Sequence, residues 1–343
     1  MQPDTHIVAT GSASPALMKG NQESGAGRWT VIQVPTMSFY EYCKLLNLDQ
    51  PQLPPSLKIT QMLHMTYQEQ AGIMLQLSKV QNYFIRYLQV GGFPELALAD
   101  NDLMAQQIMR EDVVDKVLKR DLPSLYNIRN ATELERIFLY LCNVSSEIVS
   151  IEAIAKELSG VSRPTVENYI QYLESANLIY QSWPVDMAGR KPLKASPKIY
   201  IADAAIRNAV LMDDSLLTDA TEMGKIVETA VYKHVAAFYY QNNTSVGYYR
   251  GGRKSKEIDI VVNKPKAYNI LIEVKYRDGA PIKNDDAISE LCSSANAAII
   301  VSKLADDFGM RPSSSGGEML CIPAFAFLYL LGYAEKNGYK GIY

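Results

Sequence analysis

The spacing of apolar positions changes along the chain, and the first half is dominated by helical spacing. Apolar residues recur every three to four positions across residues 74–88 and again across 103–119, which predicts two helices. Ser38 and Glu41 stand three residues apart ahead of another apolar run, the pattern of a capping box at a helix start. The sequence at 91–94 is rich in Gly and Pro and predicts a turn.

The middle of the chain predicts three helices followed by two strands. Helices are expected at 133–142, 150–158 and 163–176, and strands at 178–184 and 198–202. Two helices joined by a short turn, with a hairpin after them, form a winged helix. This segment is therefore predicted to be a winged helix-turn-helix module.

If this module binds DNA, its third helix is the one that enters the major groove. The polar residues expected on its exposed side are Arg163, Thr165, Asn168 and Gln171. Phosphate contacts would come from a basic wing, made by Arg190, Lys191, Lys194 and Lys198. Acidic residues on the same helix favour the alternative, a module that contacts protein rather than DNA.

The last third changes to short runs rich in β-branched residues. A helix is expected at 224–241, and strands are expected at 245–250, 256–262, 270–276 and 297–301. A helix beside several strands predicts a compact α/β domain.

Length and charge narrow the function classes. A chain of 343 residues is long enough for two or three domains. The formal net charge of −3 excludes a uniformly basic nucleic-acid binder, so such binding would need local patches. The most apolar stretch, 320–334, is too short to span a bilayer and contains Pro323. With no signal peptide pattern at the start and no Cys or His spacing typical of zinc, we expect a cytoplasmic protein without a membrane partner.

Candidate chemistry concentrates on two neighbouring strands. Side chains alternate between sheet faces, so Glu257 and Asp259 are predicted to share one face, as are Glu273 and Lys275. A connection centred on Lys266 places Asp259 opposite Glu273. Two carboxylates in that position repel each other, whereas a divalent cation between them reverses the sign of the interaction. Mg²⁺ is the ion that carboxylates and phosphates bind together, so Asp259 and Glu273 are the predicted metal ligands.

Two further residues complete the predicted site. Lys275 would hold a phosphate or orient the attacking water, and Glu228, on the preceding helix, would add a ligand or position that water. A bound metal lowers the pKa of such a water and stabilises charge on the phosphorus oxygens. The alternative is a solvated strand face on which the same residues form salt bridges.

These four residues resemble the PD-(D/E)xK nuclease superfamily. Its core has an acid on the first helix, an Asp on one strand and Glu-x-Lys on the next, matched here by Glu228, Asp259, Glu273 and Lys275. The resemblance implies a restriction-endonuclease-like domain and Mg²⁺-dependent phosphodiester hydrolysis on DNA.

A wider resemblance covers nearly the whole chain. Thr10 to Ser12, Arg28, the Ser38 capping box and the Gly-Gly-Phe-Pro turn precede the nuclease-like end in the order found in AAA-type ATPases with a C-terminal domain of unknown function. This resemblance implies that Thr10 and Ser12 belong to a sensor strand and that Arg28 is an arginine finger, so these three are the cofactor-binding candidates. No P-loop sequence occurs. ATP would therefore bind only if a missing N-terminal part is supplied. The chain would then be a truncated product, or half of a split protein whose partner chain supplies the ATPase half.

The sequence thus predicts an α/β multidomain protein. Residues 1–125 are expected to be the C-terminal part of an AAA-type domain, 126–205 the winged helix, and 206–343 the nuclease-like domain. The predicted function is Mg²⁺-dependent nuclease action on DNA, without ATPase activity for this chain alone. Two alternatives remain open: a non-catalytic module that binds DNA or protein, and an inactive fragment of an ATPase.

Overall fold

The structure is a computed structural model, and it describes residues 34–55, 57–158, 160–185, 195–212, 218–240, 244–251, 256–278 and 282–336. The sensor strand implied for Thr10 to Ser12 lies outside the described residues, and Val34, the first of them, is in neither a helix nor a strand. The three cofactor-binding candidates, Thr10, Ser12 and Arg28, also lie outside them.

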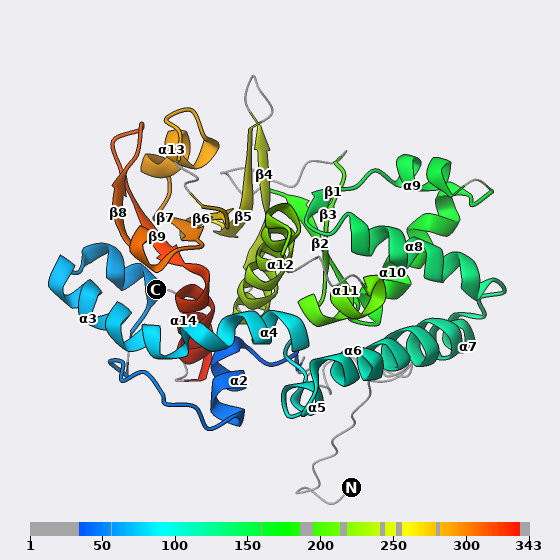
Figure 1. Cartoon of the computed structure of the whole chain (residues 1–343). Coiled ribbons are helices and arrows are strands. Elements are labelled where there is room, and N and C mark those ends of the chain that lie inside the picture. The colour runs from blue at the N-terminus through cyan, green and yellow to red at the C-terminus, as the bar shows by residue number, and fades with distance from the viewer. Residues whose placement is uncertain are drawn as a thin grey trace, which may run out of the picture.

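One mixed sheet runs through the molecule (Figure 1). It has nine strands in the order β1-β3-β2-β4-β5-β6-β7-β9-β8. In chain order they are β1 Glu147–Ile148, β2 Ile179–Pro184, β3 Lys198–Ile201, β4 Ser245–Gly251, β5 Lys256–Lys264, β6 Tyr268–Lys275, β7 Ala297–Ser302, β8 Gly309–Pro312 and β9 Glu318–Pro323. The prediction of an α/β protein is confirmed at this level.

The joint between the two halves of the sheet is a short parallel pairing of β2 with β4. Trp183 pairs with Gly247 and Pro184 with Tyr248. A Cβ atom on Gly247 would lie 2.1 Å from the carbonyl oxygen of Trp183, so only glycine allows this approach. The strands predicted at 178–184 and 198–202 therefore share one sheet with the strands of the last third.

The helices of the first half lie along one side of the molecule. They are α2 Phe39–Leu45, α3 Tyr67–Leu77, α4 Phe84–Val90, α5 Pro94–Ala97, α6 Asp102–Arg110 and α7 Leu122–Tyr126, with 3₁₀ turns at Ile59–His64 and Ser78–Tyr83. The predicted capping box is present, because the Ser38 hydroxyl accepts from the Glu41 N–H and the Glu41 carboxylate accepts from the Ser38 N–H. The helix predicted at 74–88 is instead interrupted by the second 3₁₀ turn, and the one at 103–119 passes into a π-helix, Glu111–Asp121.

The remaining helices follow the sequence prediction more closely. They are α8 Ala131–Asn143, α9 Ile151–Glu157, α10 Arg163–Ser175, α11 Ala204–Leu211, α12 Ala220–Tyr239, α13 Ala287–Leu291 and α14 Ala324–Lys336, with 3₁₀ turns at Cys292–Ser294 and Ala305–Asp307. The predicted Ser150 cap is present at the start of α9. The apolar stretch 320–334 is buried, as predicted, and comprises most of β9 and of α14.

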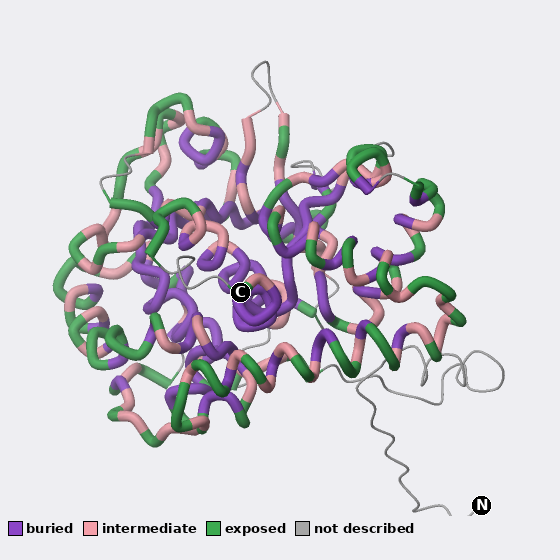
Figure 2. The backbone as a smooth tube through the Cα atoms, turned by 45° about the vertical axis from the view of Figure 1, so that its right-hand side comes forward, coloured by how far each residue is buried: buried purple, intermediate pink, exposed green. Residues whose placement is uncertain are grey.

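Apolar side chains form two cores on opposite faces of the central strands, and buried backbone concentrates around this sheet in Figure 2. The larger core includes Ile260, Ile270 and Ile272 and is covered by α12 and α14. The smaller one includes Ile258 and Leu271 and is covered by α13. Among the described helices, none is long and apolar enough to cross a membrane.

Candidate functional site

The four predicted site residues come from three adjacent elements. Glu228 lies on α12, Asp259 on β5, and Glu273 and Lys275 on β6. A tight turn joins the two strands, with Lys266 at φ 61°. The observed pairs run from Lys264 with Tyr268 to Ile260 with Ile272. The register predicted from a connection centred on Lys266 is confirmed for these pairs, which end one residue short of Asp259 and Glu273.

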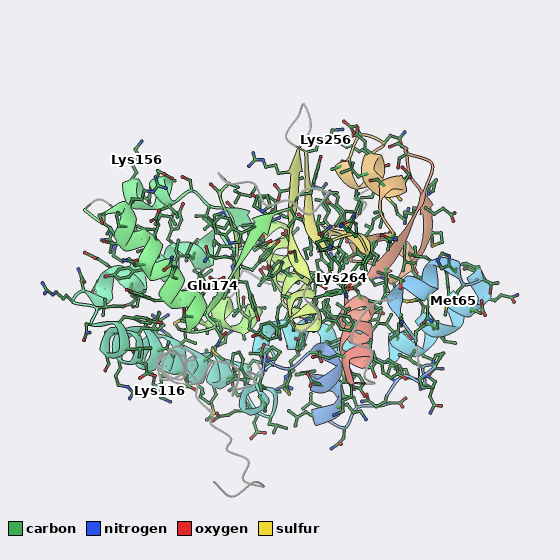
Figure 3. The ribbon with its side chains drawn as sticks, turned by 180° about the vertical axis from the view of Figure 1, so that it is seen from behind. Met65, Lys116, Lys156, Glu174, Lys256 and Lys264 are labelled. Carbon is green, nitrogen blue, oxygen red and sulfur yellow. The ribbon has the colours of Figure 1, made fainter. Side chains whose placement is uncertain are left out.

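The pairing of β5 with β6 stops one residue before Asp259, because β5 carries a bulge there. Gly247 of β4 faces Val261, whereas Tyr249 faces Ile258, so β5 has one extra residue in this interval. Lys256 and Lys264, the two ends of β5, are labelled in Figure 3. Ile258 consequently lies in the smaller core and Ile260 in the larger one. Regular alternation along β5 would put Ile258 on the same face as Ile260, and the bulge is the reason that it does not lie there.

The bulge turns Asp259 toward α12 and leaves its carboxylate between two neighbours. Its Oδ2 accepts a hydrogen bond from the backbone N–H of Val274 at 2.9 Å. Its Oδ1 lies 3.1 Å from Nζ of Lys198. Asp259 therefore accepts from β6 through one oxygen and forms an ion pair with β3 through the other.

Lys198 is the centre of an acidic cluster that the sequence did not predict. Its Nζ lies 2.7 Å from Glu228 Oε1 and 2.8 Å from Glu257 Oε1, besides its contact with Asp259. The residue is 2% exposed. The Tyr200 hydroxyl also donates to Glu228 Oε1, at 2.8 Å. Lys198 thus holds three carboxylates from α12 and β5 around one ammonium group.

Glu273 and Lys275 form a second part of the site. The Lys275 Nζ lies 2.7 Å from Glu273 Oε1. Glu273 Oε2 is buried and has no hydrogen-bond partner among the residues that the structure describes. Asp286, the residue before α13, raises the pKa of Lys275 together with Glu273 and Asp259, so Lys275 lies in a largely acidic environment.

Burial and mutual repulsion make two of the acids hard to ionise. Burial and then the charge of Asp259 raise the pKa of Glu228 to about 7, although Lys198 opposes the shift. Burial and the charge of Asp259 raise the pKa of Glu273 to about 8, against the opposing effect of Lys275. Burial disfavours the charge on Lys198, yet its anionic neighbours outweigh burial and raise its pKa well above the usual value. Perturbed groups of this kind concentrate at functional sites.

The charge balance fits a divalent cation. Glu228, Glu257, Asp259 and Glu273 are four carboxylates, and the ammonium groups of Lys198 and Lys275 offset two of them. With all four ionised, the remaining formal charge is −2, which one divalent cation would neutralise, and Glu273 Oε2, which has no hydrogen-bond partner among the described residues, offers an acceptor. In the described part of the chain, however, no three His, Cys, Asp or Glu side chains already stand in a metal-holding arrangement. The cation among Glu228, Glu257 and Asp259 is Lys198.

Two predictions about individual residues change as a result. Lys198, expected on a basic wing, is buried in the acidic cluster and does not contribute positive charge to an exposed surface. Glu257, predicted to share a strand face with Asp259 and not to belong to the site, binds Lys198 within the cluster and pairs with Arg250 of β4. The other wing residues, Arg190, Lys191 and Lys194, lie outside the described residues.

The exposed side of α10 is less basic than the sequence suggests. Arg163, Asn168 and Gln171 are exposed, and Thr165 is half-buried. The Arg163 guanidinium is already paired, at 2.7 Å with Glu152 and at 2.9 Å with Glu167. A phosphate would have to compete with both carboxylates for Arg163.

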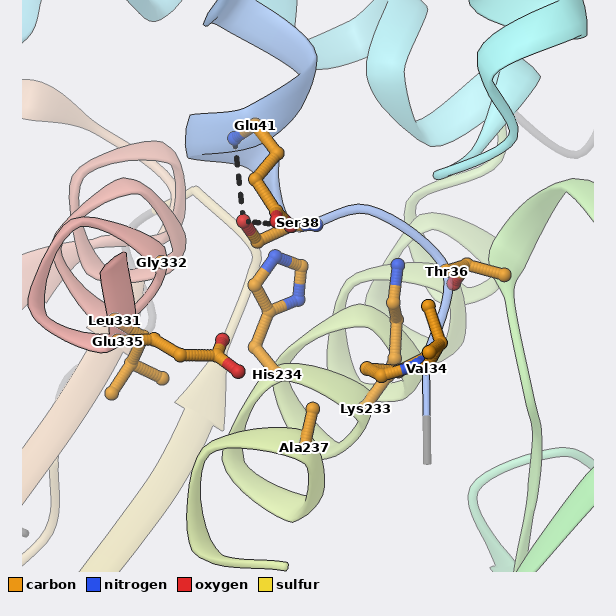
Figure 4. Close-up of a pocket in the computed structure, with 11 residues that line it drawn as sticks. Val34, Thr36, Ser38, Glu41, Lys233, His234, Ala237, Leu331, Gly332 and Glu335 are labelled. Carbon is orange, nitrogen blue, oxygen red and sulfur yellow. Dashed lines mark hydrogen bonds between the residues drawn. The ribbon is translucent and has the colours of Figure 1, made fainter. Parts of the chain in front are cut away.

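A cavity of about 220 Å³ lies away from the acidic cluster, between α2, α12 and α14 (Figure 4). Lys233 and His234 of α12 line it together with Ser38 and Glu41. His234 Nε2 accepts from the Phe39 N–H at 3.0 Å, and burial lowers its pKa to about 3. These polar groups are hydrogen-bonded to other groups of the same chain. None of the predicted catalytic residues lines the cavity.

Comparison with known domain families gives two matches, which together lie within residues 81–321. The chain resembles two domain families of unknown function. DUF8612 matches residues 81–217 and DUF4143 matches residues 223–321. The boundary between the two matches falls between β3 and β4, so Lys198 comes from the first region and its three carboxylate partners come from the second.

Two curated relatives are described only as uncharacterized proteins. One, from Methanocaldococcus jannaschii, is 25% identical over 261 residues, which is 75% of this chain and 52% of that protein. The other, from Haemophilus influenzae, is 24% identical over 208 residues, which is 60% of this chain and 45% of that protein. The chain spans about half the length of these relatives. No solved structure matches it.

Proposed function

We propose that the chain is a metal-dependent phosphodiesterase that cleaves DNA, with its site at the splayed ends of β5 and β6. The observation that supports this most is the convergence of four carboxylates and two ammonium groups at one place, with a formal charge of −2 and an unpartnered buried oxygen on Glu273. Without a cation, the raised pKa values of Glu228 and Glu273 keep part of this charge neutral, and a divalent ion would allow all four carboxylates to ionise.

The residues divide the chemistry among them. Asp259 and Glu273 would hold the metal, here Mg²⁺, which would activate a water and stabilise the charge that builds on the phosphorus oxygens. Lys275 donates from beside Glu273 and orients the water or a phosphate oxygen. Glu228, whose pKa is about 7, can hold or release a proton near neutral pH.

In this proposal the last third of the chain is a PD-(D/E)xK-like nuclease domain, and residues 126–205 are a winged helix. The match to DUF4143 covers all four proposed site residues. An AAA-type domain ahead of them is part of the same proposal and rests on the resemblance of nearly the whole chain to AAA-type ATPases. ATP binding would then require a P-loop-bearing segment beyond this chain.

The test combines metal binding with cleavage. Millimolar Mg²⁺ should raise the melting temperature of the wild type, because an ion that binds only the folded state stabilises it. Asp259→Asn should abolish both this shift and Mg²⁺-dependent nicking of supercoiled plasmid. Lys275→Met should keep the shift and lose the nicking, by roughly 100-fold or more if Lys275 orients the attacking water.

Lys303→Met provides the matched control for Lys275. Lys303 follows β7 next to the site, and its ammonium pairs with the exposed Asp278 at 3.0 Å. The Lys303→Met protein should nick supercoiled plasmid at the wild-type rate. Nicking by Asp259→Asn at the wild-type rate would show that the activity belongs elsewhere.

The second candidate is a non-catalytic module in which the acidic cluster is only an ion-pair network. The specific observation in its favour is Lys198, which already supplies a cation to three of the carboxylates. This alternative predicts no Mg²⁺-dependent thermal shift and no cleavage. Binding to DNA or to a protein would then come from other surfaces, such as the exposed side of α10.

A further inference from the structure

Lys198 is held in place by its backbone and not only by its side chain. Its strand β3 lies between β1 and β2, where Lys198 pairs with Ile148 on one side and Ser182 on the other. The side chain is 3% exposed and crosses from this part of the sheet to β5 and α12. Only rotation of the side chain can therefore move the ammonium group away from the acids.

The ammonium group has the same partners that a metal ion would use. An ammonium has three N–H donors, and each has a carboxylate oxygen within 3.1 Å, from Glu228, Glu257 and Asp259. Mg²⁺ also binds carboxylate oxygens. Asp259 belongs to both sets, because it is the residue shared between the Lys198 cluster and the proposed metal site.

A second observation points to a missing cation. Glu273 is 8% exposed, and its Oε2 has no hydrogen-bond partner among the described residues. Glu273 lies near enough to Asp259 and Glu228 for both charges to raise its pKa. Lys198 therefore supplies positive charge to Glu228, Glu257 and Asp259, and it leaves the buried Oε2 of Glu273 without a cation.

We propose that Lys198 is an internal competitor of the divalent cation: its ammonium group must leave Asp259 and Glu228 before the metal binds them with full affinity. This inference rests on the proposed metal-dependent function and adds its regulation. The competitor is contributed by the DUF8612 region and acts on residues of the DUF4143 region. Whatever moves the Lys198 side chain, such as a phosphate that attracts it, raises metal affinity.

Mn²⁺ binding measured by isothermal titration calorimetry tests the competition without relying on activity. Lys198→Met keeps the length of the stem and removes the charge, and Lys198→Gln removes the charge and keeps a donor. Both should bind Mn²⁺ at least about tenfold more tightly than the wild type, a change of about 1.4 kcal/mol. Lys198→Arg keeps the charge and should not tighten binding.

The matched control is Lys256→Met. Lys256 begins β5 one residue before Glu257, and its ammonium pairs with Glu290 rather than with the cluster. Removing it should change Mn²⁺ affinity by less than about threefold, because its half-buried ammonium is paired with Glu290 and contacts none of the carboxylates around Lys198. Thermal unfolding of each variant establishes that it is folded before titration.

The outcomes separate this inference from the proposed function. If the wild type binds Mn²⁺ and Asp259→Asn does not, but Lys198→Met and Lys198→Gln bind no more tightly than the wild type, Lys198 is not a competitor and the metal site stands. If neither the wild type nor any Lys198 variant binds Mn²⁺, the metal-dependent function itself is wrong, and the competition falls with it.

Discussion

At the scale of single residues, the site depends on groups whose charge is difficult to maintain. Glu273 is the clearest case, because it is buried, repelled by Asp259 and only half satisfied by Lys275. Its carboxylate can be neutral, as a proton holder, or charged beside a cation. The same feature makes it a candidate ligand and a source of instability in the metal-free protein.

We expect Glu273→Gln to stabilise the metal-free protein at high pH. The pKa of the Glu273 carboxyl is about 8 in the folded wild-type chain against an ordinary 4.5, so between pH 4.5 and pH 8 the protein takes up a proton when it folds. The contribution of this group to stability is therefore full below pH 4.5 and lost as pH rises through about 8. In buffer with a chelator, Glu273→Gln should melt above the wild type at about pH 9, and the difference should shrink at about pH 5.

Glu318→Gln is the matched control for this experiment. Glu318 is an exposed residue at the start of β9, so the same substitution there should give no pH-dependent difference from the wild type. A Glu273→Gln protein that melts below the wild type at high pH would mean that the ion pair with Lys275 outweighs the cost of the buried charge.

The candidate site shows how far single residues can be predicted from sequence. Asp259, Glu273 and Lys275 were predictable because strand alternation and a short turn place them near one another, whereas Glu228, on the preceding helix, was added from the PD-(D/E)xK resemblance. Lys198 was not, because its partners lie 30, 59 and 61 residues further along the chain. Its lysine-rich neighbourhood suggested exposure, and only the tertiary fold shows that it is buried.

At the scale of elements, caps and turns were predictable and interruptions were not. The Ser38 capping box and the Ser150 cap depend on neighbouring residues only, and both are present. The 3₁₀ turn at Ser78–Tyr83 and the π-helix at Glu111–Asp121 leave the apolar spacing almost unchanged. The bulge in β5 is set by its pairing with β4, which a single strand's sequence does not reveal.

The turn at Gly91 and Gly92 gives a prediction at this scale. A Cβ on Gly92 would lie 2.3 Å from the carbonyl oxygen of Met37 and 2.8 Å from Nζ of Lys233. The backbone cannot retreat easily, because the Met37 N–H donates to Gly92 O at 2.8 Å. We expect Gly92→Ala to lower the free energy of unfolding by about 2 kcal/mol or more, measured by urea denaturation.

The opposite result is expected for Gly72→Ala. Gly72 lies in α3 with nothing within 4 Å of a Cβ atom. Alanine should stabilise that helix by about 0.5–1 kcal/mol. Equal effects at the two glycines would contradict the steric argument for Gly92.

At the scale of the whole molecule, a buried ion pair connects parts that are distant in sequence. Lys233 of α12 lies 2.9 Å from Asp203, the cap of α11. Asp203 also accepts from the Thr36 hydroxyl at 2.7 Å and from the Gly92 N–H at 3.1 Å. Burial would raise the pKa of Asp203, but Lys233 and these hydrogen bonds outweigh it and hold the pKa below its usual value.

Lys233→Met should therefore destabilise the whole fold. It leaves the charge of Asp203 buried without its partner, for which about 3–5 kcal/mol is the usual loss. Urea denaturation should show a smaller loss when Asp203→Asn is added to Lys233→Met, because the unpaired charge is then removed. Lys303→Met breaks an exposed pair and should cost less than about 1 kcal/mol. A Lys233→Met protein as stable as Lys303→Met would rule out this role.

The parallel joint between β2 and β4 limits the modularity of the chain. The two family matches look like separable units along the sequence, yet they divide one hydrogen-bonded sheet. A fragment made of the DUF4143 region alone would leave the β4 edge unpaired, so that a strand from another chain could add to it. The fragment would also lack Lys198, the cation that neutralises part of the charge of its carboxylates. Gene fusions that exchange this region between relatives would have to bring β2 and β3 along with it.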